Sequence, residues 1–274
     1  MGRGVVYWST HGAAEYCNPR GTYMTQTEIL IKSTYDGTMQ PSLYYKSPSA
    51  EKRPLLVGLH TWSYDRFNQI GNMLPVAEKY DYNLLLPEFR GKNKAANPHC
   101  TEACASVAAM QDVKDAIDWA IREGNADPDH VFLLGLSGGG HMALMMAGFC
   151  PEVFEVIGSF VPITDLKKWA SQNAGYRPDV LVCCSESEEE MMKRSPISYI
   201  DSIARANVKI FHGKYDPSVP VSHSVELYEA ITAKYPRSRV FLDVFDGGHV
   251  IDMEQAMYWI HSQYKKTKKT EVTG

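Results

Sequence analysis

Short apolar runs alternate along the chain with longer amphipathic stretches. The runs at 54–59, 131–134 and 239–245 are rich in valine, leucine and phenylalanine, which predicts buried β-strands. The stretches at 67–81 and 102–123 predict helices. In the second stretch apolar residues recur at helical spacing, at Val107, Met110, Val113, Ile117 and Ile121. This alternation predicts an α/β fold, in which a mostly parallel central sheet carries helices on both faces.

The alternation of strands and helices is interrupted between residues 166 and 202. Within this segment Ser187 is followed three residues later by Glu190, which is the pattern of a capping box. A short helix is therefore expected to begin there and to continue to Arg194. We expect the interval at about 166–202 to be a small insertion rather than another repeat of the α/β pattern.

One serine lies between two predicted elements, directly behind the apolar run at 131–134. The residues at 135–139 read Gly-Leu-Ser-Gly-Gly, and the chain beyond them is a good helix former. A strand-to-helix turn this tight strains the serine backbone, and the glycines two residues before and after it provide the clearance that the turn needs. The strain directs the hydroxyl toward substrate. Ser137 is therefore the candidate nucleophile.

A serine hydroxyl needs a histidine base, and the histidine needs a carboxylate to orient it. Asp216 lies in a turn-rich loop behind the β-rich run at 208–212. His249 follows the predicted strand at 239–245, on a loop that two glycines leave free to bend. The chain order serine, aspartate, histidine is the order of α/β-hydrolases. Asp216 is the candidate acid and His249 the candidate general base.

Two other residues compete for these roles. Asp165 also follows a predicted strand and is the rival acid. His141 comes four residues after the serine, where it is expected to pack or to bond a neighbouring loop. Asp-Pro pairs also start turns, so Asp216 has a reading as a turn residue alone. Its place after a strand, between the serine and the histidine, favours the acid.

Further segments resemble the catalytic domain of the prolyl oligopeptidase family. They are an entry hairpin with an Asp-Gly turn at 33–46, a Pro-x-x-Arg-Gly loop at 87–91, a Ser-Pro segment at 194–199 and a His-Gly-x-x-Asp motif at 212–216. The resemblance covers about 27–260. It implies an α/β-hydrolase fold, a cap over the active site at 166–202, and a serine hydrolase that needs no cofactor or metal. It says little about the substrate.

The resemblance also indicates where the negative charge of an acyl-transfer intermediate is held. One donor is expected to be the backbone N–H of Gly138, at the start of the helix that follows the serine. The second is expected from the loop after the strand at 54–59, which reads His-Thr-Trp where relatives carry His-Gly-Gly or His-Gly-aromatic. Trp62 fills the aromatic position, and Thr61 replaces a glycine. Either of these two residues is a candidate second donor.

The predicted substrate is a carboxylic ester. Oligopeptidases of this family carry a β-propeller ahead of the hydrolase domain, and this chain starts close to that domain. We expect one domain over 1–274, with an N-terminal extension at 1–26, similar to free-standing esterases. Acetyl and feruloyl esterases belong to that group, so a small-molecule or oligosaccharide ester is the expected partner.

Two further functions stay open. An aminopeptidase or acyl-peptide hydrolase needs a charge that anchors a peptide terminus, and Glu88 and Arg90 are the candidates. A binding protein without activity is the other alternative, and the complete triad argues against it. Tyr64 and Trp169 are candidates for the lining of an apolar acyl pocket.

Composition narrows the classes further. The chain has 274 residues, 44% hydrophobic and 22% charged, which suits one enzyme domain. A net charge of −4 gives no reason to expect nucleic acid as a partner. No run approaches the roughly 18 apolar residues of a membrane span. Residues 1–8 lack the apolar core of a secretory signal, so the expected location is cytoplasmic, or secreted or periplasmic if a signal peptide was removed.

The six cysteines do not have the spacing of a metal site. Cys100 and Cys104 lie four residues apart, close enough to meet on one side of a helix, but neither a histidine nor another cysteine follows at zinc spacing. Reduced, buried thiols are expected in a cytosolic protein. The sequence leaves open whether Cys100 and Cys104 pair.

Overall fold

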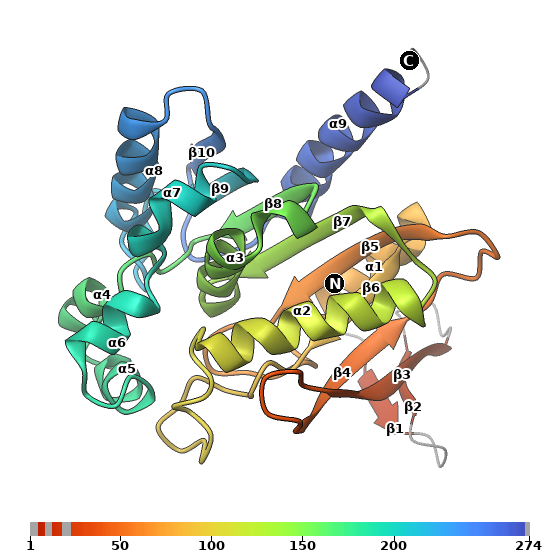
Figure 1. Ribbon diagram of the computed structural model, residues 1–274, viewed down its shortest axis with the longest axis horizontal. Coiled ribbons are helices and arrows are strands. Elements are labelled where there is room, and N and C mark those ends of the chain that lie inside the picture. Colours follow the sequence, from red (N-terminus) through yellow and green to blue (C-terminus); the bar gives the residue numbers. More distant parts are fainter. Residues whose placement is uncertain (1–4, 9–12, 18–22, 272–274) are drawn as a thin grey trace.

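The structure, a computed structural model, describes residues 5–8, 13–17 and 23–271 (Figure 1). Its strands form one ten-stranded sheet in the order β1-β2-β3-β4-β6-β5-β7-β8-β9-β10. From β6 to β10 all neighbours are parallel, whereas β1 to β4 pair antiparallel and β4 joins β6 antiparallel. The expected mostly parallel sheet is confirmed.

The strands are β1 (Val5–Trp8), β2 (Ala13–Cys17), β3 (Tyr23–Lys32), β4 (Met39–Tyr45), β5 (Arg53–Leu59), β6 (Asn83–Pro87), β7 (Ala126–Leu136), β8 (Val156–Phe160), β9 (Asn207–Gly213) and β10 (Arg239–Phe245). The helices are α1 (Ile70–Tyr80), α2 (Val107–Arg122), α3 (Gly138–Phe149), α4 (Leu166–Gln172), α5 (Arg177–Cys183), α6 (Glu188–Lys193), α7 (Ile200–Ile203), α8 (Ser222–Lys234) and α9 (Met253–Glu271). Short 3-10 turns lie at Pro151–Val153 and Pro196–Tyr199.

Helices cover both faces of the sheet, and each face has its own core. On one face α2, α3 and α8 pack on the strands, with Met110, Leu144 and Leu227 among the buried residues. On the other face α1 and α9 bury Leu74 and Ile260 against the sheet. The strands of the centre are buried on both sides, which explains why β5 and β7 read as continuous apolar runs. Among the described residues, no helix combines the length and the apolarity needed to cross a bilayer.

The N-terminal strands enlarge the sheet at its antiparallel edge. The stretch expected to be an extension, 1–26, contains β1, β2 and the start of β3, which add to the edge in antiparallel order. Residues 1–4, 9–12 and 18–22 of that stretch lie outside the described part of the chain. The predicted hairpin follows, with Gly37 at φ +79° in the turn between β3 and β4.

The predicted starts of two helices were wrong. α2 begins at Val107 rather than at residue 102, because Cys104 and Ala105 have positive φ angles of 50° and 51°, which a right-handed helix does not allow. Ser106 then caps the helix, since its side chain accepts a hydrogen bond from the Ala109 N–H. α1 also begins three residues later than expected, at Ile70.

The interval at 166–202 contains several short helices, where the sequence predicted one. Figure 1 shows α4, α5 and α6 lying together at the left of the view, below α7. α6 begins where the capping pattern predicted, because the Ser187 side chain accepts from the Glu190 N–H. This group, α4 to α6, is called the cap segment below.

Candidate active site

Ser137 occupies the sharp turn between β7 and α3. Its φ of +57° and ψ of −116° are unusual for a residue that carries a side chain. The turn is held by the Ser137 N–H, which donates to the Phe160 carbonyl on β8 at 2.9 Å, and by the His141 N–H, which donates to the Ser137 carbonyl at 2.8 Å. Ser137 is half-buried. The backbone therefore presents its hydroxyl at the carboxyl edge of the parallel sheet.

The glycines beside the serine are required by close backbone contacts. A Cβ atom on Gly135 would lie 2.0 Å from the Gly139 carbonyl oxygen, and one on Gly139 would lie 2.5 Å from the Leu59 carbonyl oxygen. Both distances are far shorter than a carbon atom tolerates. The Gly-x-Ser-x-Gly pattern is thus explained by the packing of β7 and α3 against each other and against β5.

Asp216 and His249 come together from two neighbouring loops. The Nδ1 atom of His249 lies 2.7 Å from Oδ2 of Asp216. The loops are held together by the Tyr215 N–H, which donates to the Gly247 carbonyl at 2.9 Å. A Cβ atom on Gly213 would lie 2.1 Å from the Gly248 carbonyl oxygen, so a larger residue would push the loops apart.

The Asp216 carboxylate is fixed from both sides. Its Oδ1 atom accepts from the backbone N–H groups of Ser218 and Val219, at 2.8 and 2.9 Å. Its side chain has no exposed area, whereas the His249 side chain is 24% exposed. Burial raises the pKa of Asp216, but the hydrogen bonds from His249 and from the two amides outweigh it and lower this pKa. Asp216 is therefore a charged acceptor at neutral pH.

His212 connects the loop that carries Asp216 to α8. This residue belongs to the motif at 212–216, but sequence reasoning gave it no role. Its Nδ1 atom lies 2.6 Å from the Ser224 hydroxyl on α8, and its Nε2 atom lies 2.9 Å from the Val219 carbonyl and 3.5 Å from Asp216 Oδ2. Burial lowers the pKa of His212. A neutral, buried imidazole thus holds the Asp216 loop against α8.

The loop after β5 offers one of its two candidate amides. The Thr61 N–H donates to Oδ1 of Asn68 at 3.0 Å and is therefore occupied. The Trp62 N–H has no such partner within the described part of the chain. A Cβ atom on Gly138 would lie 2.4 Å from the Trp62 nitrogen, so the amide of Trp62 lies directly beside Gly138. Asn68 was missed from sequence, because nothing in its own pattern shows that it bonds the loop.

Asp165 and His141, the two residues that compete for the acid and base roles, make contacts that stabilise the fold. Asp165 is the N-cap of α4, where its Oδ1 atom accepts from the Lys168 N–H at 2.9 Å. His141 is fully buried in α3, and its Nε2 atom lies 2.6 Å from the Arg194 carbonyl oxygen. His60, at the start of the loop after β5, is also buried and stacks on Phe89 with ring centroids 3.8 Å apart.

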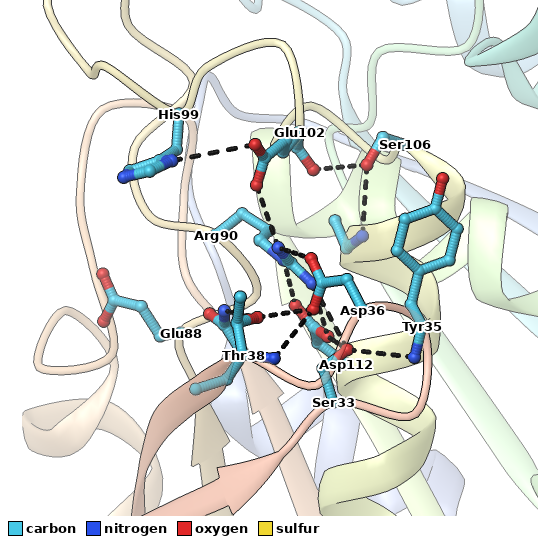
Figure 2. Close-up of polar contacts among 12 residues, drawn as sticks. Ser33, Tyr35, Asp36, Thr38, Glu88, Arg90, His99, Glu102, Ser106 and Asp112 are labelled. Carbon is cyan, nitrogen blue, oxygen red and sulfur yellow. Dashed lines mark hydrogen bonds and ion pairs between the residues drawn. The ribbon is translucent and has the colours of Figure 1, made fainter.

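The two candidates for anchoring a peptide terminus are engaged in ion pairs. The Glu88 carboxylate accepts from Arg66 at 2.8 Å. Arg90 lies at the centre of Figure 2, where all five of its guanidinium N–H groups are used. Their acceptors are Asp36, Glu102, both oxygens of Asp112, and the Ser33 hydroxyl.

These contacts give Arg90 a structural role. Its side chain is 2% exposed and lies at the wall of an open cavity of about 410 Å³ that Glu88 and Glu102 also line. Because every donor is satisfied by the protein, Arg90 holds the β3–β4 hairpin, the loop after β6 and α2 together. Glu88 lines the same cavity, and its carboxylate is paired with the guanidinium of Arg66.

Two aromatic candidates lie in different surroundings. Trp169 is 1% exposed, and its Nε1–H donates to the Ser218 carbonyl at 2.9 Å. It also packs against Trp62 with ring centroids 4.9 Å apart. Trp169 therefore connects the cap segment to the Asp216 loop and to the loop after β5, as a core residue rather than as pocket lining. Tyr64 is 57% exposed.

The described residues contain no group of three or more histidine, cysteine or acidic side chains that could hold a metal ion. The polar groups at the carboxyl edge of the sheet are instead a hydroxyl, an imidazole, a carboxylate and backbone amides. This is the set of groups that serine-dependent acyl transfer uses.

Comparison with known proteins identifies the family. The family model described as "Prolyl oligopeptidase family" matches residues 74–269, which is more than half of the chain. The chain belongs to the prolyl oligopeptidase family. This confirms the family inferred from the motifs, and the serine hydrolase class that goes with it.

Two curated relatives are much longer than this chain. The human acylamino-acid-releasing enzyme is 26% identical over 214 residues, which is 71% of this chain and 28% of that protein. The Arabidopsis thaliana acylamino-acid-releasing enzyme is 28% identical over 192 residues, which is 65% of this chain and 25% of that protein. The chain thus spans about a quarter of the length of these relatives.

Solved structures show the same fold. The structure of a Pyrococcus horikoshii acylaminoacyl peptidase has a TM-score of 0.64 at 17% identity, over 82% of this chain and 37% of that one. The structure of the Pyrococcus furiosus esterase Pf2001 also has a TM-score of 0.64, at 19% identity, over 89% of this chain and 90% of that one. These likenesses confirm the α/β-hydrolase fold.

Proposed function

We propose that this protein hydrolyses acyl bonds through a covalent intermediate on Ser137. The observation that carries the proposal is the strained serine at the end of β7, on the same edge of the sheet as the bonded Asp216–His249 pair. Membership of a serine hydrolase family supports it independently. In this proposal the three residues act as nucleophile, acid and base.

The first step is attack of Ser137 on the substrate carbonyl. His249 takes the proton of the hydroxyl on its Nε2 atom, because its Nδ1 atom is bonded to Asp216. The buried carboxylate stabilises the imidazolium that forms. His249 then returns the proton to the leaving group, and water releases the acyl group by the same route.

The negative charge on the carbonyl oxygen is held by two backbone amides in this proposal. They are the N–H groups of Gly138, at the first turn of α3, and of Trp62, which lies directly beside it. Thr61 is not assigned, because its N–H is bonded to Asn68.

We propose carboxylic esters as the preferred substrates. The charges that a free peptide terminus would need are engaged within the protein, since Arg90 uses all its donors internally and Glu88 is paired with Arg66. An ester needs no such anchor. An ester also has a better leaving group than an amide. The likeness to an esterase over nearly the full length of both chains supports the same choice. No comparison points to a carbohydrate ester in particular.

A second candidate is the hydrolysis of N-acylated peptides. The relatives named acylamino-acid-releasing enzymes favour it. Such a peptide has no free amino terminus, so it suits the same ion-paired surroundings. The two candidates differ in the bond that is cleaved, and a substrate panel separates them.

The nucleophile is tested by covalent labelling with an organophosphonate. Wild-type protein is expected to gain one adduct on Ser137, and Ser137→Ala to gain none. Ser185→Ala is the matched control, because Ser185 also has a positive φ angle, of 52°, and is exposed. Loss of labelling in the Ser185 variant, or equal labelling of the Ser137 variant, would sink the assignment.

The bond preference is tested with matched chromogenic substrates. Turnover of p-nitrophenyl acetate and butyrate should exceed that of N-acetylalanine and alanine p-nitroanilides by at least roughly a hundredfold, about 2.7 kcal/mol of barrier. Comparable turnover of the acetylated anilide would favour the second candidate. A strict requirement for the free amine would contradict both.

A further inference from the structure

Four of the six cysteines meet where the cap segment packs against the loop before α2. Cys100 and Cys104 belong to that loop, and Cys183 and Cys184 lie at the end of α5. All four are buried in one apolar cluster, in which Cys100, at 4%, is the most exposed. The two segments are far apart in the sequence, so the tertiary structure alone brings these thiols together.

The four thiols form two pairs across the contact. Within this buried cluster the Cys104 side chain interacts with that of Cys184, and the Cys100 side chain interacts with that of Cys183. Each pair therefore joins the loop to the cap segment. Neither pair joins two cysteines of the same segment.

Arg194 holds the two backbones in this register independently of the thiols. Its Nη1 atom donates to the carbonyl of Ala103 at 3.2 Å and to that of Cys183 at 3.1 Å. These carbonyls belong to the residues directly before Cys104 and Cys184. A single guanidinium thus places the two cysteines of the first pair opposite each other.

The charge of Arg194 acts on both thiols of the first pair. The hydrogen bond with Cys104 lowers the pKa of Cys184, burial opposes this, and the Arg194 charge lowers the pKa further. The same hydrogen bond, together with burial, raises the pKa of Cys104. The Arg194 charge also acts to lower the pKa of Cys104, so both sulfurs lie beside a cation that favours the thiolate, the reactive form of cysteine.

We propose that Cys104 and Cys184 form a reversible disulfide that ties the cap segment to the loop before α2, with Cys100 and Cys183 as the second pair of the same site. The oxidant is a hydroperoxide such as hydrogen peroxide. Cys184 gives up its proton, its thiolate attacks one peroxide oxygen, and the O–O bond breaks; the leaving hydroxide takes up that proton, so a sulfenic acid and one water result. The Cys104 sulfur then attacks the sulfenic sulfur, the S–O bond breaks, and the second water leaves with the Cys104 proton. Two thiols and one peroxide give one disulfide and two waters.

The position of the pair connects it to the proposed active site. The Cys104 N–H donates to Oδ1 of Asn93 at 2.8 Å, and the Asn93 N–H donates to the Trp62 carbonyl at 2.9 Å. These two hydrogen bonds, through Asn93, connect Cys104 to the loop after β5 that contains Trp62. A disulfide at Cys104 therefore fixes a loop that is bonded to that one. Formation of the disulfide does not depend on the proposed function, and its test needs no turnover.

The test uses the full-length protein, first reduced and then treated with hydrogen peroxide. After alkylation of the remaining thiols and cleavage at Glu102, the peptide that carries both Cys183 and Cys184 should be linked to two others, and its fragmentation should map one bond from Cys104 to Cys184 and one from Cys100 to Cys183. The protein should lose about 2 Da for each disulfide before alkylation, and dithiothreitol should restore the mass. Oxidation should also raise the Tm, because the link restricts the unfolded chain.

Two variants sharpen the result. Cys104→Ser should remove the Cys104–Cys184 bond and keep the other, and Cys184→Ser should do the same if the first variant does not fold. Cys150→Ser is the matched control, because Cys150 is equally buried, 3% exposed, but lies at the end of α3. It should keep both links.

Other outcomes overturn the proposal. Wild-type protein without a Cys104–Cys184 bond contradicts it, and so does oxidation of Cys184 that stops at the sulfinic acid. A bond mapped within one segment, from Cys100 to Cys104 or from Cys183 to Cys184, contradicts the pairing.

Discussion

At the scale of single residues, Asp216 shows how one carboxylate both shapes a loop and orients a base. One oxygen accepts from two backbone amides of its own loop, and the other accepts from His249. The same group would thus hold the backbone in place and keep the imidazole in the tautomer that catalysis needs.

Asp216→Asn separates these two contributions. The amide oxygen can still accept from the loop, but the amide cannot stabilise an imidazolium, so kcat should fall by about 10⁴ with little change in Tm. The measurement is turnover of p-nitrophenyl acetate beside thermal unfolding. Asp165→Asn is the control, because Asp165 only caps α4. If the Asp165 variant is the crippled one, the acid has been misplaced.

At the level of elements, Arg90 joins the β3–β4 hairpin, the loop after β6 and α2, beside the hydrogen bonds that Ser33 and Thr34 of the hairpin make to Asp112 and Asp115 of α2. Asp36 comes from the turn of the β3–β4 hairpin, and Asp112 comes from α2, where its side chain is 1% exposed (Figure 2). Burial raises the pKa of Asp112, although Arg90 and Ser33 oppose it. The carboxylate is therefore stable in its charged form only while Arg90 stays beside it.

Arg90→Met should strongly destabilise the protein. The substitution keeps most of the side-chain volume but leaves Asp112 buried without its cation, which should cost about 3–5 kcal/mol in the free energy of unfolding. Urea denaturation at pH 7 measures it. The control is Arg53→Met, since Arg53 is 34% exposed and its ion pairs should contribute less than about 1 kcal/mol. An equal loss of unfolding free energy in both variants would show that Arg90 does not hold these three elements together.

At the scale of the whole molecule, buried histidines connect the layers. His141 bonds α3 to the segment before β9, His212 bonds β9 to α8, and His223 on α8 lies 3.0 Å from Gln172 on α4. Burial lowers the pKa of all three, to about 4 for His141 and to about 3 for His223. The folded protein therefore keeps them neutral at pH values where the unfolded chain protonates its histidines.

The consequence is a loss of stability in mild acid. For His141 the pKa falls from 6.5 to about 4 on folding, so its contribution is complete above pH 6.5 and is lost as the pH drops toward 4. Between pH 7 and pH 5 this residue alone should reduce the free energy of unfolding by roughly 2 kcal/mol.

His141→Gln tests this, because glutamine can still donate to the Arg194 carbonyl but does not titrate. Urea unfolding at pH 7, 6 and 5 should give a shallower loss in this variant than in wild type. His99→Gln is the control, since the His99 side chain is 66% exposed. A pH profile of the His141 variant that is parallel to wild type would contradict the assignment.

Much of the fold and the candidate triad could be predicted from local sequence. A glycine pattern around Ser137 reports a strained turn, because backbone contacts at Gly135 and Gly139 exclude any side chain. Buried parallel strands read as continuous apolar runs for an equally local reason. The order of Ser137, Asp216 and His249 then follows from the order in which the strands end at one edge of the sheet.

Contacts between distant segments could not be predicted in this way, because a residue's own neighbours do not show what will pack on it. Arg90 sits in a loop motif, yet the acceptors contributed by α2 and the hairpin make it structural. The sequence favoured Trp62 over Thr61 as the second donor but left both open, and only the structure shows that the Thr61 amide is bonded to Asn68. Cys104 was expected to lie in a helix with Cys100, but a positive φ angle and the register held by Arg194 place it against Cys184 instead. Local strain and apolar periodicity can be predicted from the sequence, because both depend on neighbouring residues. Only tertiary packing decides which donor meets which acceptor.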